Sequence, residues 1–183
     1  NTHEKLRELV CADMLDLSSI ESELVGYDAC LFCLGISSQG MSEAEYKRIT
    51  YDIAMSAANT LVKHNPDMTF EFISGAGSDS TEKGKLMWAR IKGMTENALL
   101  ALPFKSVYVI RPAYIQPLGG IVAREKWIRW VYAVFGPLYP LLKRLFPQYV
   151  TSTEQLGRAM IRIARDGAPK HVLGSRDINA IAA

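Results

Sequence analysis

The sequence predicts an α/β fold with a doubly wound parallel sheet. Short apolar runs alternate with longer segments whose apolar residues recur at helical spacing, and the runs are too apolar to leave one face in water. A strand, a helix and a second strand can be read directly from residues 70–112. This alternation is typical of parallel strands joined by crossover helices. With 183 residues, the chain suits one domain over 1–183.

The expected elements follow from apolar runs, turn residues and helix-start signals. They are strands over 6–11, 29–34, 70–73, 106–110 and 170–173, and helices that begin at Ser18 and span 43–63, 85–102 and 152–165. Ser18 and Glu21 have the spacing of a capping box. His64 to Asp67 includes Pro66, which ends the long helix before the third strand.

The ends of the strands carry the candidate site. In doubly wound sheets, ligands bind outside the carboxyl ends of the strands. Those ends carry Asp13, Gly35, Ser74 with Gly75, and Arg111 with Pro112. We expect them to line one crevice, where the glycines after Ser74 let the backbone approach a ligand closely.

Cysteines and histidines indicate no metal site. Cys30 and Cys33 form a Cys-x-x-Cys, but they lie in an apolar strand, on which positions three apart face opposite ways. We therefore expect them to pack rather than to bind metal or act in redox chemistry. The three histidines, His3, His64 and His171, have no metal-ligand spacing.

Charge and cysteine content bear on partners and location. The net charge is +2 without a long basic run, so nothing points to nucleic acid as a partner. An odd count of three cysteines argues against a disulfide framework. With no secretory signal visible, we expect a cytoplasmic protein.

Residues 114–149 form an aromatic, lid-like insertion with three interpretations. It covers a substrate, it packs in the core or a dimer, or it contacts a membrane surface through 127–146. The last interpretation uses four basic residues, Lys126, Arg129, Lys143 and Arg144. Arg129, Pro137, Pro140 and Lys143 interrupt any run long enough to span a membrane. An oligomer is compatible with the second interpretation.

Several segments together resemble a known family. They are Asp13-Met14-Leu15-Asp16, Leu34-Gly35, Phe72-Ile73-Ser74, Lys92, Arg111-Pro112, and Thr151 to Ala159. In this order the chain resembles, over nearly its whole length, the atypical and extended short-chain dehydrogenases/reductases, in the NAD(P)-dependent epimerase-like branch. The resemblance implies an NAD(P)-binding Rossmann-like fold with NAD or NADP as cofactor.

The resemblance also implies roles for individual residues. Asp13 and Met14 would contact the adenine, Leu34 and Gly35 the adenosine and pyrophosphate path, Ser74 the nicotinamide and substrate carbonyl, Lys92 the nicotinamide ribose, and Pro112 the nicotinamide amide. Ser74 and Lys92 would be the catalytic residues. Read without the resemblance, Asp13 is a turn or helix cap, Ser74 a turn residue and Lys92 a solvated helix lysine.

Two features depart from the family pattern. The glycine-rich phosphate loop is absent, as are the first two strands and the helix between them. We expect that first strand, which would lie between the strands ending at Asp13 and Gly35, to exist in the natural protein or to be replaced. The position four before Lys92 holds Trp88 instead of tyrosine, and an indole cannot act as the acid/base.

Two functions follow as hypotheses. The first is an NAD(P)-binding oxidoreductase or epimerase-like enzyme, which acts on a small carbonyl or sugar-type substrate held under residues 114–149. The second is a catalytically inactive nucleotide-sensing regulatory or scaffold protein of the same fold, which Trp88 favours. A peripheral membrane protein is a third, weaker idea.

Overall fold

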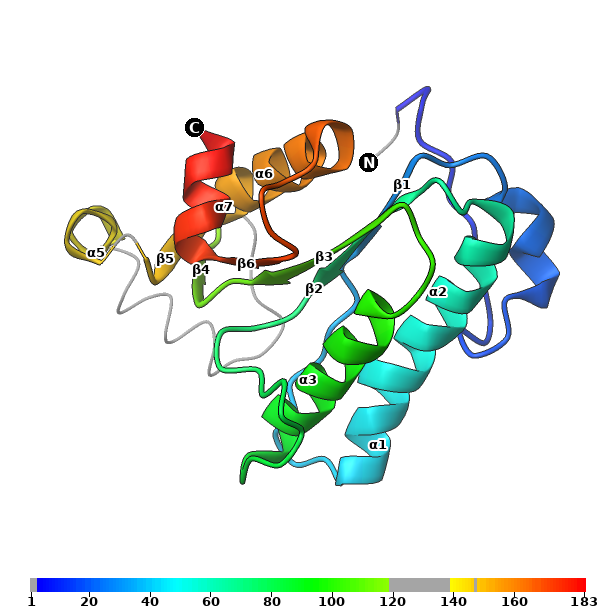
Figure 1. Cartoon of the computed structure of the whole chain (residues 1–183), viewed down its shortest axis with the longest axis horizontal. Helices are drawn as coiled ribbons and strands as arrows, with labels where there is room; N and C mark the ends of the chain where they lie inside the picture. The colour runs from blue at the N-terminus through cyan, green and yellow to red at the C-terminus, as the bar shows by residue number, and fades with distance from the viewer. Residues whose placement is uncertain (1–2, 119–138, 147) are drawn as a thin grey trace.

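The computed structural model describes residues 3–118, 139–146 and 148–183 (Figure 1). Its main sheet has four strands in the order β1-β2-β3-β6. They are β1 (Ala29–Phe32), β2 (Thr69–Ile73), β3 (Ser106–Arg111) and β6 (Val172–Gly174). All three neighbouring pairs are parallel, so the carboxyl ends of the strands lie at the same edge. The prediction of an α/β protein with a parallel sheet is confirmed.

Helices cover both faces of this sheet (Figure 1). On one face lie α1 (Glu43–Lys47), the π-helical turn η2 (Arg48–Asp52), α2 (Ile53–His64) and α3 (Met87–Leu100). On the other face lie α6 (Thr153–Asp166) and α7 (Ser175–Ala182). Phe32, Phe70 and Phe72 belong to the core under α2, whereas Tyr108, Ile110 and Leu173 pack with α6 and α7.

Side chains at the helix ends explain where two helices begin. Ser42 accepts a hydrogen bond from the backbone of Glu45, whose carboxylate accepts one from the backbone of Ser42, so α1 starts with a capping box. Ser152 caps α6 through the backbone N–H of Gln155. The predicted helices over 43–63, 85–102 and 152–165 are all present, and each begins and ends within two residues of the expected position.

Two predictions near the N-terminus are wrong. Residues 6–11 form no strand and pair with none of the described strands, and Val10 is 84% exposed. The following helix, η1 (Ser18–Leu24), is a 3₁₀ helix with Leu17 at its N-cap and no side-chain cap. Glu21 pairs with His64 at 2.7 Å instead of closing a capping box.

A second, smaller sheet was not predicted. It pairs β4 (Tyr114–Gln116), at the start of the lid-like insertion, with β5 (Val150–Ser152) in parallel. A helix, α5 (Tyr139–Leu145), precedes β5. The rest of the lid-like insertion, residues 119–138 and 147, lies outside the described residues.

β1 forms one edge of the main sheet. Among the described residues, its only neighbouring strand is β2, and Leu31 at its centre is 41% exposed. The additional strand expected beside β1 therefore stays a prediction.

Cys30 packs against the phenylalanine core while Cys33 is exposed, and burial raises the pKa of Cys30 to about 12. Its thiol thus stays protonated at neutral pH.

No helix within the described ranges combines the length and the apolarity that crossing a membrane requires.

Candidate functional site

Hydroxyl and carboxylate groups meet at the carboxyl ends of β2 and β3. Ser74 directly follows β2, and its hydroxyl donates to the carboxylate of Glu96 on α3. The Ser78 hydroxyl lies 2.9 Å from Ser74 Oγ and also donates to the carbonyl oxygen of Gly75 at 2.8 Å. Ser74, Ser78 and Glu96 are all buried. The side chains of Glu96 and Ser78 therefore hold Ser74 on two sides, so Ser74 does more than form a turn.

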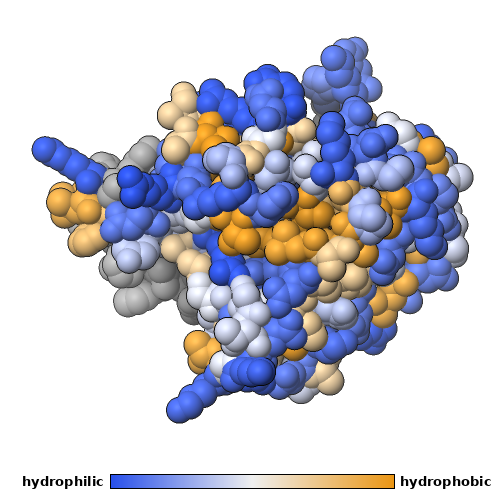
Figure 2. Space-filling model, viewed as in Figure 1, coloured by the Kyte–Doolittle hydropathy of each residue, from blue (hydrophilic) through white to orange (hydrophobic). Residues whose placement is uncertain are grey.

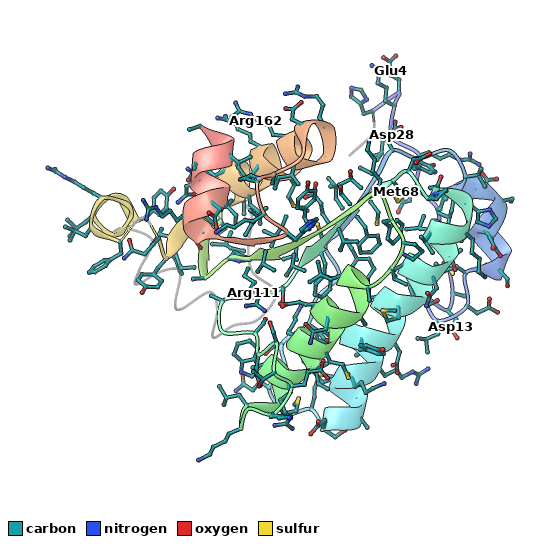
Figure 3. The ribbon with its side chains drawn as sticks, in the orientation of Figure 1. Glu4, Asp13, Asp28, Met68, Arg111 and Arg162 are labelled. Carbon is teal, nitrogen blue, oxygen red and sulfur yellow. The ribbon has the colours of Figure 1, made fainter. Side chains whose placement is uncertain are left out.

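The guanidinium of Arg111 completes this cluster at the end of β3 (Figure 3). Its Nε lies 3.1 Å from both carboxylate oxygens of Glu96, and its Nη2 also donates to Glu96 and, at 2.6 Å, to Ser80 Oγ. The Glu96 side chain is 1% exposed and that of Arg111 22%. The sequence prediction missed Glu96, although its spacing of four residues from Lys92 places both on one helix face.

Lys92 lies under the end of β2 rather than in solvent. Its Nζ donates to the carbonyl oxygen of Ile73 at 3.1 Å and lies 4.7 Å from the centre of the Phe72 ring. Lys92 is 8% exposed. Burial lowers the pKa of its amine to about 8, although the charge of Glu96 acts in the opposite direction. Reading Lys92 as a solvated lysine is therefore wrong, and its amine can change protonation near neutral pH.

Trp88, one helical turn before Lys92, packs against the glycine turn. A Cβ atom on Gly77 would lie 3.3 Å from the Trp88 ring, and Gly77 has a positive φ of 92°. The turn is also tied to the segment after β3, because Ala76 N–H donates to the carbonyl oxygen of Pro112 at 2.9 Å. Pro112 is buried and borders this turn, as expected for a site at these strand ends.

Asp13 and Met14 lie in a different place, beside the long helix. They line a cavity of about 450 Å³ together with Met41, Arg48 and Ile49, so the π-helical turn forms part of its wall. Figure 3 shows Asp13 and Arg111 well apart, with α2 and α3 between them. Asp13 Oδ1 accepts a hydrogen bond from Leu15 N–H at 2.9 Å, as a turn cap does.

Leu34 and Gly35 follow β1 in an open position. Leu34 is 42% exposed, and a Cβ atom on Gly35 would meet no atom within 4 Å. The structure therefore brings together Ser74, Lys92 and Pro112. Asp13 and Met14 form a second group, and the expectation that Asp13 follows a strand is wrong.

A buried carboxyl group lies on β2, in register with Leu31 and Tyr108. Glu71 is fully buried, and neither of its carboxyl oxygens has a hydrogen-bond partner among the described residues. Burial raises the pKa of Glu71 to about 8.

In the described part of the chain, no three histidine, cysteine, aspartate or glutamate side chains come together in a way that could hold a metal ion. The expectation of no metal site stays a prediction.

No protein-family model matches the chain, and no curated protein matches it.

Proposed function

We propose that the protein binds a nicotinamide dinucleotide, NAD or NADP, at the carboxyl edge of the main sheet. It would act as an oxidoreductase or epimerase-like enzyme on a small carbonyl or sugar-type substrate. The observation that carries the proposal is the position of Lys92, whose amine bonds to the residue that precedes Ser74 at the end of a central parallel strand. Ligands of such sheets bind at this edge.

The residues present fit parts of such a cofactor. Lys92 offers a buried cation and Ser74 a hydroxyl at one place, and the cavity beside Asp13 and Met14 offers a separate place for the adenine end. The diphosphate has no equivalent support here, because residues 78–86 separate the glycine turn from the start of α3. Contacts to the diphosphate would therefore come from elsewhere in the protein.

When bound, the cofactor would supply or accept the hydride. Ser74 would lie beside the substrate oxygen, with its hydroxyl held in position by the hydrogen bond that it donates to Glu96. Lys92 would hydrogen-bond the ribose, and its charge would favour an anionic ligand. The loop around Pro112 would exclude water from one side of the nicotinamide.

Calorimetric titration of the full-length protein with NADH and with NADPH tests the proposal. We expect micromolar binding that Lys92→Met weakens at least tenfold, or about 1.4 kcal/mol. Lys63→Ala is the matched control, because Lys63 is exposed near the end of α2. If folded protein binds neither cofactor, or if both variants bind equally well, the proposal is wrong.

Trp88 supports a second candidate function, a nucleotide-sensing regulatory or scaffold protein without turnover. Its indole packs on the glycine turn and has no ionisable proton in the relevant pH range. Cofactor oxidation assayed with a panel of aldehydes, ketones and sugar nucleotides separates the two candidates. Turnover supports the enzyme, whereas cofactor binding without turnover across the panel supports the sensor.

A further inference from the structure

Large apolar side chains are exposed on and after α5. Leu141 and Leu145 are four residues apart on the helix and are 53% and 57% exposed, while Phe146 and Tyr149 are 48% and 58% exposed. We call these four residues the α5 surface. Figure 1 shows α5 at one end of the molecule, well apart from α3 and the turn after β2. Figure 2 shows apolar side chains at this end, next to strongly hydrophilic ones.

Backbone hydrogen bonds hold the α5 surface in place. Tyr149 N–H donates to the carbonyl oxygen of Phe146 at 3.0 Å, and Tyr114 N–H donates to the carbonyl oxygen of Tyr149 at 2.9 Å. The second bond joins this turn to the start of β4, and β5 begins at the next residue. The turn that carries Phe146 and Tyr149 is therefore tied to the small sheet, directly after the helix that carries Leu141 and Leu145.

The charged residues that neighbour the α5 surface along the sequence have one sign. Residues 139–153 contain Lys143 and Arg144 and no aspartate or glutamate, and the sequence has no acidic residue between Glu125 and Glu154. Arg144 is exposed. Leucine and phenylalanine beside basic residues, with tyrosine at the boundary, is the combination found where proteins contact the interface of anionic bilayers.

We propose that the α5 surface binds the surface of an anionic phospholipid bilayer. Leu141, Leu145 and Phe146 enter the boundary between head groups and acyl chains, and Arg144 contacts lipid phosphates. A seven-residue helix lies on such a surface and does not cross it. The inference is independent of the proposed function, because none of these residues belongs to the site around Ser74 and Lys92.

Co-sedimentation of the full-length protein with vesicles tests this inference. We expect binding to phosphatidylcholine vesicles that contain phosphatidylserine and weaker binding to phosphatidylcholine alone. Leu145→Glu combined with Phe146→Glu should reduce binding about tenfold, and so should Arg144→Glu. Two matched controls on α6 should bind as the unchanged protein does: Ile161→Glu, at a leucine-sized side chain that is 62% exposed, and Arg158→Glu, at an arginine that is 67% exposed.

Three results would overturn the inference. The first is that the folded protein fails to bind the anionic vesicles. The second is that the α6 controls lose as much binding as the α5 variants do. Alternatively, analytical ultracentrifugation shows a dimer that Leu145→Glu with Phe146→Glu dissociates, in which case the α5 surface is an interface between copies of the chain. Circular dichroism of each variant separates loss of binding from loss of folding.

Discussion

Arg111 and Glu96 form an ion pair that joins the end of β3 to the middle of α3, with the carboxylate almost entirely buried. Arg111→Ala would leave this carboxylate without its counter-charge in a site that water hardly reaches. We expect the free energy of unfolding to fall by about 3–5 kcal/mol, measured by urea denaturation.

Two comparisons make this prediction specific. Arg111→Met combined with Glu96→Leu should cost less than Arg111→Ala alone, because it removes the stranded charge together with its partner. Arg7→Ala breaks an exposed pair with Glu23 and should cost no more than about 1 kcal/mol. If Arg111→Ala and Arg7→Ala lower the free energy of unfolding equally, the buried pair contributes no more to stability than the exposed one.

Gly93 marks a close contact between α3 and the loop after β2. A Cβ atom at this position would lie 1.8 Å from the carbonyl oxygen of Asp79, which is backbone and cannot rotate away. We expect Gly93→Ala to lower the free energy of unfolding by about 3 kcal/mol or more. Differential scanning fluorimetry measures the matching fall in Tm.

Gly157 provides the control for Gly93, because it also lies inside a helix but has open space around it. Gly157→Ala should raise stability by about 0.5–1 kcal/mol, since alanine favours helix. An unchanged Tm in Gly93→Ala would contradict the close packing of the loop on α3.

Glu71 should make stability fall as pH rises. The folded protein keeps the proton up to a pKa of about 8, while the unfolded chain releases it near the ordinary value of 4.5. Between about pH 5 and pH 8, each pH unit therefore removes about 1.4 kcal/mol of stability through this group. Glu71→Gln should remove this slope, so its advantage over the unchanged protein grows with pH.

Urea denaturation at several pH values measures the effect of Glu71→Gln. Glu154→Gln is the control, because Glu154 is 61% exposed and should leave the slope unchanged. The prediction fails if Glu71→Gln and the unchanged protein lose stability in parallel over this range.

The affinity for a nicotinamide dinucleotide, under the proposed function, should depend on the protonation of Lys92. Its pKa of about 8 means that the charged fraction falls from about nine-tenths at pH 7 to about one-tenth at pH 9. If the charged form binds, affinity for NADH should fall about tenfold over this range. Calorimetry at both pH values measures it, and Lys92→Met should bind equally at both. A similar pH dependence in Lys92→Met would assign it to another group.

The sequence predicted the centre of the sheet well, because the strands ending at Ile73 and Arg111 are almost completely buried and consist mainly of apolar and aromatic residues. Residues 6–11 also include Leu6, Leu9 and Val10, but whether such residues form a buried strand depends on a neighbouring segment that the sequence does not reveal. β4 and β5 have three residues each, too few to show a periodicity. The sequence could place Lys92 and Ser74 at the carboxyl edge of the sheet. It could not identify Glu96 as the partner of Arg111, because that contact depends on how α3 packs against β3.

The hydrogen bonds around Ser74 require more donor protons than the hydroxyl groups of Ser74 and Ser78 supply. Ser74 contacts Glu96, Ser78 contacts Ser74, and Ser78 also contacts the carbonyl oxygen of Gly75. Two hydroxyl groups supply two protons to these three contacts. With Glu96 ionised, Ser74 donates to the carboxylate, and Ser78 can donate either to Ser74 or to Gly75.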